Sequence, residues 1–248
     1  MQRFKNKIVV ITGAGSGIGR STALRLDSEG AEILLIDKNQ EDLSATKQML
    51  NNNNSSEHVV DISSIISTKK FFDDLEKNYK RLDALINIAG ILRFDNSHEV
   101  EIENWNQILE VNLTGTFFMC RYALPLLLES KGAIVNVSST AALGAHAWTA
   151  AYSASKGGIS AFSKTLAVEY GMKGLNINCV CPASIETPMS SSPLMPKDID
   201  TRLLKKIMPL DGVNRSPDDI ASTIAFLASD DAIHINGIDL RVDGGLLT

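Results

Sequence analysis

Cysteine and histidine, the common ligands of transition metals, are scarce in this sequence. Three cysteines and four histidines are spread over 248 residues, and the histidines show no paired ligand spacing with each other or with the cysteines. We therefore expect no catalytic metal. An odd number of cysteines in a chain without an export signal also argues against a disulfide framework. We expect Cys179 and Cys181 to alternate faces of one strand and to be packing residues.

Runs of basic residues and long apolar segments are also missing. The 24 Lys and Arg residues are outnumbered by 29 Asp and Glu residues, for a net charge of −5. No basic run is present that would neutralise the phosphates of a nucleic acid. No signal peptide precedes the first predicted strand, and no apolar stretch reaches the ~20 residues that span a bilayer. These absences predict a cytoplasmic protein without nucleic-acid or membrane partners.

The first segment with a clear chemical meaning is a glycine-rich turn near the N-terminus. Residues 7–12 form a β-branched apolar run of strand length and lead directly into Gly13-Ala14-Gly15-Ser16-Gly17-Ile18-Gly19. Glycines allow a tight turn and a close approach of the backbone to a pyrophosphate. A helix expected over roughly residues 18–25 places amide donors and its positive dipole end at the phosphates. The segment therefore predicts a dinucleotide-binding loop.

An acidic residue, Asp37, ends the second predicted strand, which covers residues 31–36. A carboxylate about 20 residues after the glycine loop accepts hydrogen bonds from an adenosine ribose. It also repels a 2′-phosphate, because like charges in a half-buried site cost free energy. NAD is therefore the expected cofactor and NADP the less favoured one. Lys38 follows directly and is a cation that would tolerate the phosphate.

Tyr152 and Lys156 have the spacing that places two side chains on one face of a helix. An ammonium next to a phenol favours the phenolate and lowers a pKa of ~10 toward neutrality, as a general acid/base requires. The pair alone is a weak signal, because any amphipathic helix can contain this spacing by chance. Its place downstream of a glycine loop strengthens the prediction.

Strand and helix patterns alternate along the whole chain. After the first two strands, we expect strands at residues 58–60, 83–88, 133–137, 176–180 and 238–242, and helices at 41–50, 67–79, 105–128, 150–170 and 218–227. This rhythm implies parallel pairing with right-handed crossovers. The predicted fold is an α/β Rossmann-type doubly wound parallel sheet of about seven strands with helices on both faces, in one domain spanning residues 1–248.

Several motifs, in the right order, resemble the short-chain dehydrogenase/reductase superfamily from Lys7 to Gly245, close to its 3-oxoacyl-carrier-protein reductase-like members. Residues 12–19 are similar to the family's Thr-Gly-x-x-x-Gly-x-Gly loop. Asn87-Ile88-Ala89-Gly90 is similar to its Asn-Asn-Ala-Gly segment with one substitution, and residues 182–189 resemble its Pro-Gly-x-x-x-Thr segment. The resemblance is specific because the motifs are separate and cover almost the whole chain.

The resemblance implies the site residues. The implied catalytic residues are Asn112, Ser139, Tyr152 and Lys156. Tyr152 would act as general acid/base, and Lys156 would lower its pKa and hold the nicotinamide ribose. Ser139 would hydrogen-bond the substrate oxygen, and Asn112 would order a water that links Lys156 to solvent. The implied cofactor-binding residues are Gly13, Ser16, Gly17, Ile18, Gly19, Asp37, Asp61, Ile62, Asn87, Ala89, Gly90, Tyr152, Lys156, Pro182, Ile185 and Thr187. The expected substrate contacts are Ser139, Tyr152, Ala183 and His146, for which a solvated loop histidine is the alternative.

Two positions depart from the family pattern. Ala183 replaces a glycine, which would narrow the backbone freedom near the nicotinamide or alter the pocket floor. Ile88 replaces an asparagine that commonly pins the central strand. Neither position belongs to the catalytic set, so we expect changes of fine geometry rather than loss of activity.

Residues 190–214 depart from the strand and helix rhythm and are rich in Ser, Pro, Met and charged residues. A long surface loop is one interpretation, and a mobile lid over the substrate is the one favoured by position and family resemblance. An adaptable apolar underside would come from Met189, Leu194, Met195, Leu203 and Met208.

The sequence therefore predicts an oxidoreductase that transfers hydride between NAD(H) and a small-molecule secondary alcohol or ketone. One alternative is an NADPH-dependent 3-oxoacyl-carrier-protein reductase, which would want basic residues where this chain has Ser16 and Asp37. Another is a catalytically silent dinucleotide-binding regulatory protein, which would usually lose Tyr152 or Lys156. The resemblance implies a homotetramer, or a homodimer. No arginine clamp is evident in residues 141–185, which disfavours a small carboxylate substrate.

Overall fold

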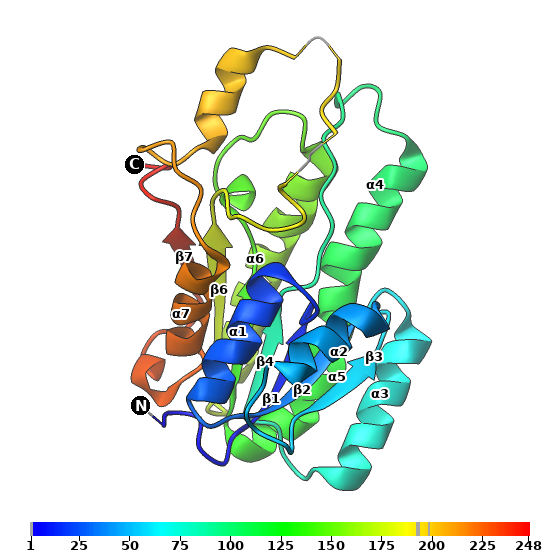
Figure 1. Ribbon diagram of the computed structural model, residues 1–248, viewed down its shortest axis with the longest axis vertical. Helices are drawn as coiled ribbons and strands as arrows, with labels where there is room; N and C mark the ends of the chain where they lie inside the picture. Colours follow the sequence, from blue (N-terminus) through cyan, green and yellow to red (C-terminus); the bar gives the residue numbers. More distant parts are fainter. Residues whose placement is uncertain (1, 192–193, 198) are drawn as a thin grey trace.

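A seven-stranded parallel sheet forms the centre of the molecule, for which we obtained a computed structural model that describes residues 2–191, 194–197 and 199–248 (Figure 1). In chain order the strands are β1 (Ile8–Thr12), β2 (Glu32–Asp37), β3 (Ser56–Val59), β4 (Ala84–Asn87), β5 (Ala133–Val137), β6 (Asn176–Pro182) and β7 (Asp239–Val242). Their order in the sheet is β3-β2-β1-β4-β5-β6-β7, and every neighbouring pair is parallel. The predicted doubly wound sheet is confirmed.

Helices follow the strands, as the alternating pattern predicts. They are α1 (Gly17–Ser28), α2 (Gln40–Gln48), α3 (Ile65–Asn78), α4 (Ile102–Leu109), α5 (Gly115–Ser130), α6 (Ala150–Gly171) and α7 (Pro217–Leu227). A π-helical turn, η1 (Glu110–Thr114), joins α4 to α5, so the helix expected over residues 105–128 runs without a break from residue 102 to 130. Short 3₁₀ turns are η2 (Thr140–Ala142), η3 (Thr201–Ile207) and η4 (Asp230–Ala232).

Helices α1, α2 and α7 cover one face of the sheet, and α3, α5 and α6 cover the other (Figure 1). Successive strand residues therefore enter different cores: Val9 and Ile11 lie in the core under the first group, and Val10 lies in the core under the second. All three are fully buried. Burial of an aliphatic side chain of this size contributes roughly 1.5–3 kcal/mol to stability. Two-sided burial explains why the strands are continuous apolar runs.

Cys179 and Cys181 lie on the same face of β6, in one small core cluster with Ile159 of α6. The expectation that they alternate faces is wrong, because side chains two positions apart on a strand point the same way. Both are buried packing residues, as expected.

One helix, Ile102–Ser130, has the length and apolar composition of a membrane span, with a mean hydropathy of 1.2 over its most apolar window. Inspection of the sequence alone did not single it out. Met119, Cys120 and Ala123 of this helix are fully buried against the sheet. Core packing therefore accounts for part of its apolar character, since 44% of that window is buried.

Candidate functional site

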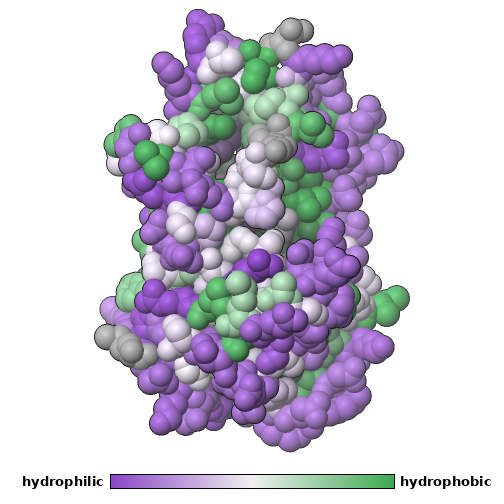
Figure 2. Space-filling view, in the orientation of Figure 1, coloured by the Kyte–Doolittle hydropathy of each residue, from purple (hydrophilic) through white to green (hydrophobic). Residues whose placement is uncertain are grey.

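A cavity of about 730 Å³ lies at the carboxyl ends of the strands. The order of strands reverses between β1 and β4, and open α/β sheets bind ligands at such a point. Figure 2 shows the hollow in the upper half of the molecule, with apolar residues gathered around its upper part. The glycine loop and the ends of β2 and β3 line one end of the cavity. Ser139, Tyr152 and several described residues between positions 183 and 208 line the other end.

The glycine loop packs too closely for side chains. A Cβ atom at Gly19 would lie 1.9 Å from the carbonyl oxygen of Gly13. Gly17 has a φ of +48°, and a Cβ there would lie 3.0 Å from Cγ2 of Thr187. This contact brings the segment after β6 against the loop. Glycine is therefore required for backbone to approach both a ligand and Thr187.

The N-terminus of α1 offers unpaired amides to that ligand. Its N-cap residue, Ser16, makes no side-chain cap hydrogen bond among the described residues, and the first turn contains no acidic side chain. In contrast, Asn39, Ser64 and Ser216 cap α2, α3 and α7 by accepting from backbone amides. Free amides at the positive end of a helix dipole suit a phosphate group. The loop and helix thus fit the pyrophosphate of a dinucleotide.

Carboxylates surround the adenosine end of the cavity. Oδ2 of Asp37 accepts from the amide of Gly15 at 3.1 Å, and Oδ1 accepts from the amide of Asn39 at 3.2 Å. Asp42, in the first turn of α2, also lines the cavity and lies beside Gly15. The sequence prediction missed Asp42, although an acid just after the end of β2 was the available signal. Asp61 lines this end as expected, and Lys38 does so too.

The segment after β4 is held by hydrogen bonds to the side chain of Thr12, and β4 itself is held by Asn87. The hydroxyl of Thr12 accepts from the amides of Ile88 and Ala89, at 3.0 and 3.2 Å. Asn87 donates to Asn136 at 2.8 Å inside the sheet. The central strands are therefore pinned without an asparagine at position 88. Asn87 does not line the cavity, and a direct contact with the cofactor stays a prediction.

The residues predicted to be catalytic come together where β5 meets α6. Ser139 lies two residues after the end of β5, is 7% exposed and accepts from the amide of Ala141 at 3.1 Å. Tyr152 lies in the first turn of α6. Lys156 follows one turn later, 3% exposed, and its Nζ donates to the carbonyl of Val137 at 2.7 Å. Nζ lies 5.7 Å from the ring centroid of Tyr152.

Burial controls the titration of this pair. Burial raises the pKa of the Tyr152 phenol, and the hydrogen bond with Ser139 lowers it by less. Burial also lowers the pKa of Lys156 to about 8. In this structure the desolvation of a phenolate outweighs the hydrogen bond with Ser139, and the expectation that Lys156 brings the phenol pKa toward neutrality stays a prediction.

Asn112 acts from behind the cavity wall. It is fully buried in the π-helical turn and does not line the cavity. Its Oδ1 accepts from the amide of Ile91 at 2.8 Å, and its Nδ2 donates to the carbonyl of Ile91 at 2.9 Å and to Oγ of Ser155 at 3.0 Å. These bonds tie the wall residue Ile91 to α6.

Two of the expected substrate contacts, His146 and Ala183, line the cavity. Nε2 of His146 is buried and has no hydrogen-bond partner among the described residues, and burial lowers the pKa of the ring. His146 also lines a smaller neighbouring cavity of about 390 Å³. Ala183 does not have a positive φ, so the alanine adds a methyl group to the cavity wall without backbone strain.

The segment 190–214 covers the end of the cavity near Tyr152. Met189, Met195 and Met208 line the cavity as predicted, and so do Leu204 and Ile207, which the sequence did not single out. Leu194 is 90% exposed, so its assignment to the underside is wrong. Leu203 faces the smaller cavity instead. Ser192, Pro193 and Asp198 of this segment lie outside the described residues.

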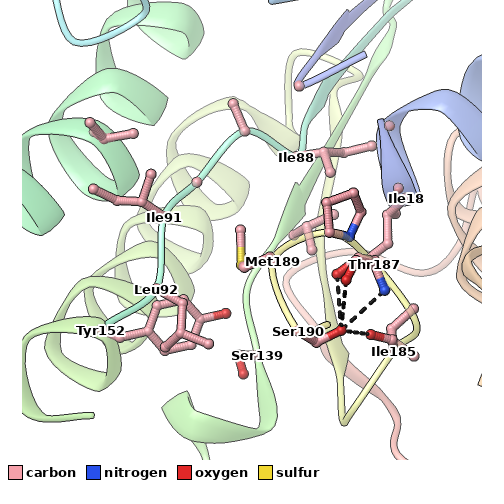
Figure 3. Close-up of a pocket in the computed structure, with 18 of the residues that line it drawn as sticks. Ile18, Ile88, Ile91, Leu92, Ser139, Tyr152, Ile185, Thr187, Met189 and Ser190 are labelled. Carbon is pink, nitrogen blue, oxygen red and sulfur yellow. Dashed lines mark hydrogen bonds between the residues drawn. The ribbon is translucent and has the colours of Figure 1, made fainter. Parts of the chain in front are cut away.

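Figure 3 shows how the parts face one another. Leu92, Tyr152 and Ser139 lie on one side, and Ile18, Thr187 and Ile185 lie on the other, with the side chain of Met189 in the space between them. Hydrogen bonds from the Ser190 hydroxyl to the carbonyls of Ile185 and Thr187 shape the second wall. Within the described part of the chain, no group of three His, Cys, Asp or Glu residues has the geometry to hold a metal ion.

A family model described as enoyl-(acyl carrier protein) reductase matches residues 13–247. The chain belongs to the short-chain dehydrogenase/reductase family. It is 36% identical to a meso-2,3-butanediol dehydrogenase of Serratia marcescens, over 98% of this chain and 95% of that protein. It is 35% identical to a 3beta-hydroxysteroid dehydrogenase of Mediterraneibacter gnavus, over 100% of this chain and 97% of that protein.

Among solved structures, a 3-ketoacyl-(acyl-carrier-protein) reductase from Brucella melitensis complexed with NADH is similar, with a TM-score of 0.88 and 29% identity. The alignment covers 98% of this chain and 99% of that one. Members of this short-chain dehydrogenase/reductase family bind a nicotinamide dinucleotide. The chain is accordingly an oxidoreductase that transfers hydride between such a cofactor and the CH–OH or carbonyl group of a small molecule.

Proposed function

We propose that the protein is an NAD-preferring dehydrogenase of secondary alcohols, with Tyr152 as its general acid/base. The observation that carries the proposal is the convergence of Ser139, Tyr152 and Lys156 at the end of a cavity whose other end is a glycine loop. A catalytically silent binding protein has no need for a buried lysine and a buried phenol side by side. Such a pair costs stability, because burial disfavours the charged form of each group.

The proton chemistry follows from the positions of the side chains. Bound nicotinamide dinucleotide supplies or accepts the hydride at C4 of its ring. Tyr152 donates its phenolic proton to the carbonyl oxygen in reduction and removes the hydroxyl proton in oxidation. Ser139 donates a hydrogen bond to the same oxygen as charge develops on it. The ammonium of Lys156 stabilises the phenolate that reduction leaves behind.

Lys156 and Asn112 are given different roles. Lys156 would hold the nicotinamide ribose. Asn112 is a positioning residue, since it contacts Ile91 and Ser155 and not the cavity. A water that links Lys156 to solvent stays a prediction.

The preference for NAD is supported by the carboxylates of Asp37 and Asp42 at the adenosine end. A 2′-phosphate there would meet two negative charges and one cation, Lys38. An NADPH-dependent reductase of carrier-protein thioesters is the second candidate. The similarity to the Brucella melitensis protein favours its substrate class and not its cofactor, because that protein is complexed with NADH. The two candidates differ in substrate and in cofactor, so a comparison of both separates them.

The remaining parts of the proposal concern residues 190–214 and assembly. We propose that this segment is a lid and that His146 and Ala183 contact the substrate. A homotetramer is proposed because Phe117 of α5 and Val168 of α6 are exposed apolar residues, the latter by 82%. Light scattering that gives a mass near 26.9 kDa would contradict it. A cytoplasmic location stays a prediction.

The experiment is a steady-state assay of secondary alcohols with NAD and NADP, read as nicotinamide absorbance, on wild type and Tyr152→Phe. The variant should lose about 10²–10⁴-fold in kcat and retain NADH binding, because it removes a proton donor and keeps the ring. Tyr170→Phe, on the same helix and outside the cavity, is the control. Retention of most turnover by Tyr152→Phe would exclude the assigned role.

A further inference from the structure

Three segments enclose the end of the cavity that surrounds Tyr152, and none of their described residues contributes a charged side chain to its wall. The cavity-lining members of residues 91–94, 137–149 and 182–208 include Leu92, Phe94, Met195, Leu204, Ile207 and Met208. The charged residues in the wall are Asp37, Lys38, Asp42 and Asp61 at the adenosine end, Glu110 in η1, and Lys156. Lys206 of the lid faces the smaller cavity instead.

Most polar side chains of these segments are already satisfied by the protein. The hydroxyl of Thr140 donates to the carbonyl of Pro182 at 3.2 Å, and that of Thr149 donates to the carbonyl of His146 at 2.9 Å. The hydroxyl of Ser190 donates to nearby carbonyls as well. Ser139 and Tyr152 remain for the reacting oxygen of the substrate. His146 and Ser184 remain for one further polar group.

The ratio of apolar surface to free polar groups in this wall decides which substrates bind well. Each methylene group transferred from water to an apolar wall improves binding about fourfold. Each hydroxyl buried there without a partner weakens binding by about tenfold or more, and a charged group weakens it further. Three methionines in the wall adapt to apolar groups of different shape, because their side chains are unbranched and flexible.

We infer that the substrate is an uncharged, largely apolar secondary alcohol or the matching ketone, with at most one polar group besides the reacting oxygen. The inference rests on the proposed function and narrows it. Polyols, phosphate esters and thioesters of a carrier protein are disfavoured, because the described residues of the three segments around Tyr152 offer too few free partners for several hydroxyls or for a phosphate.

The test compares kcat/KM for 2-butanol, 2-hexanol and 2-octanol with that for 2,3-butanediol and threitol, at saturating NAD. We expect kcat/KM to increase about fourfold per methylene along the alkanols until the end of the cavity around Tyr152 is filled. The value for threitol should be at least 100-fold below that for 2-octanol. Reduction of 2-octanone and of acetoacetyl thioester by NADH is measured in parallel, and 2-octanone should be the better substrate.

Two lid variants show whether this wall is responsible. Leu204→Gln, which lines the cavity, should flatten the dependence on chain length, whereas Leu194→Gln, which is exposed, should leave it unchanged. A flat series in wild type, or a preference for threitol, 2,3-butanediol or the thioester, would overturn the inference and leave the dehydrogenase assignment standing. Absence of turnover with every alcohol and ketone would instead refute the proposed function.

Discussion

The two ends of the cavity are constructed in different ways. The nucleotide end consists of strand ends, backbone amides and carboxylates, and Gly19 and Asp37 are fixed there by contacts with other backbone atoms. The substrate end consists mainly of apolar side chains, several of them from one long segment that leaves the sheet. Contacts made by the backbone suit a cofactor that all members of a family share. Side chains on a loop can be substituted during evolution without disturbing the sheet. The first end should therefore be intolerant of substitution, and the second should be tolerant.

The largest effect is expected for Gly19→Ala at the nucleotide end. The new Cβ would lie 1.9 Å from the carbonyl oxygen of Gly13, so the loop or the start of α1 has to move. NADH affinity, measured by fluorescence titration, should fall by about 100-fold or more, because phosphate binding depends on this geometry. Gly157→Ala is the control, since a Cβ there meets nothing within 4 Å. Equal NADH affinity in both variants would show that the loop adapts.

The second prediction concerns stability and pH at Lys156. Its folded pKa of about 8 lies below the ordinary 10.5. Between these values the unfolded chain binds a proton that the folded chain does not, so this lysine makes stability rise with pH. The penalty is complete below about pH 8 and amounts to roughly 1–3 kcal/mol.

Urea unfolding of wild type and Lys156→Met between pH 7 and 10 measures this contribution as the difference between the two proteins. The difference is needed because Cys120 and Cys179, whose pKa values burial raises to about 12, change stability in the opposite direction above pH ~9. The free energy of unfolding of wild type relative to Lys156→Met should rise as the pH rises from about 8 toward 10. A stability difference between the two proteins that does not change with pH would contradict the lowered pKa of Lys156.

A smaller effect is expected at the carboxylates. Asp37→Ala combined with Asp42→Asn should reduce the preference for NADH over NADPH by about tenfold, because two charges facing the 2′-phosphate are removed. Titration of both cofactors gives the ratio. Glu41→Gln, next to Asp42 but outside the cavity wall, should leave the ratio unchanged. A preference for NADPH in wild type would remove the basis of the cofactor assignment.

The smallest effect is expected for Ala183→Gly at the substrate end. The variant restores the family pattern and removes only a methyl group from the wall, and position 183 has no left-handed backbone to relieve. We expect less than about a threefold change in kcat/KM for 2-octanol, the size of one buried methyl group. A change above tenfold would mean that this alanine shapes the reaction geometry and not only the wall.

Sequence inspection located the elements well and their contacts less well. Every predicted strand and helix is present, because the periodicity of apolar residues is a local property. Asn87 and Asn112 were placed in the site by family resemblance, yet both lie behind the cavity wall. Their hydrogen-bond partners, Asn136 and Ile91, are far away in the chain, and no local pattern shows such pairs. Leu194 was assigned inward because composition does not tell which side of a loop is covered.

The sequence by itself determined the doubly wound sheet, the glycine loop and the chemical identity of Ser139, Tyr152 and Lys156, because strand patterns, turn glycines and residue types are written locally. Only the tertiary structure decided the directions in which burial shifts the pKa values of Tyr152 and Lys156, the presence of Asp42 at the adenosine end and the apolar walls around the phenol. These properties depend on desolvation and on neighbours brought together by folding. Their physical cause is burial, which no single segment of the chain contains.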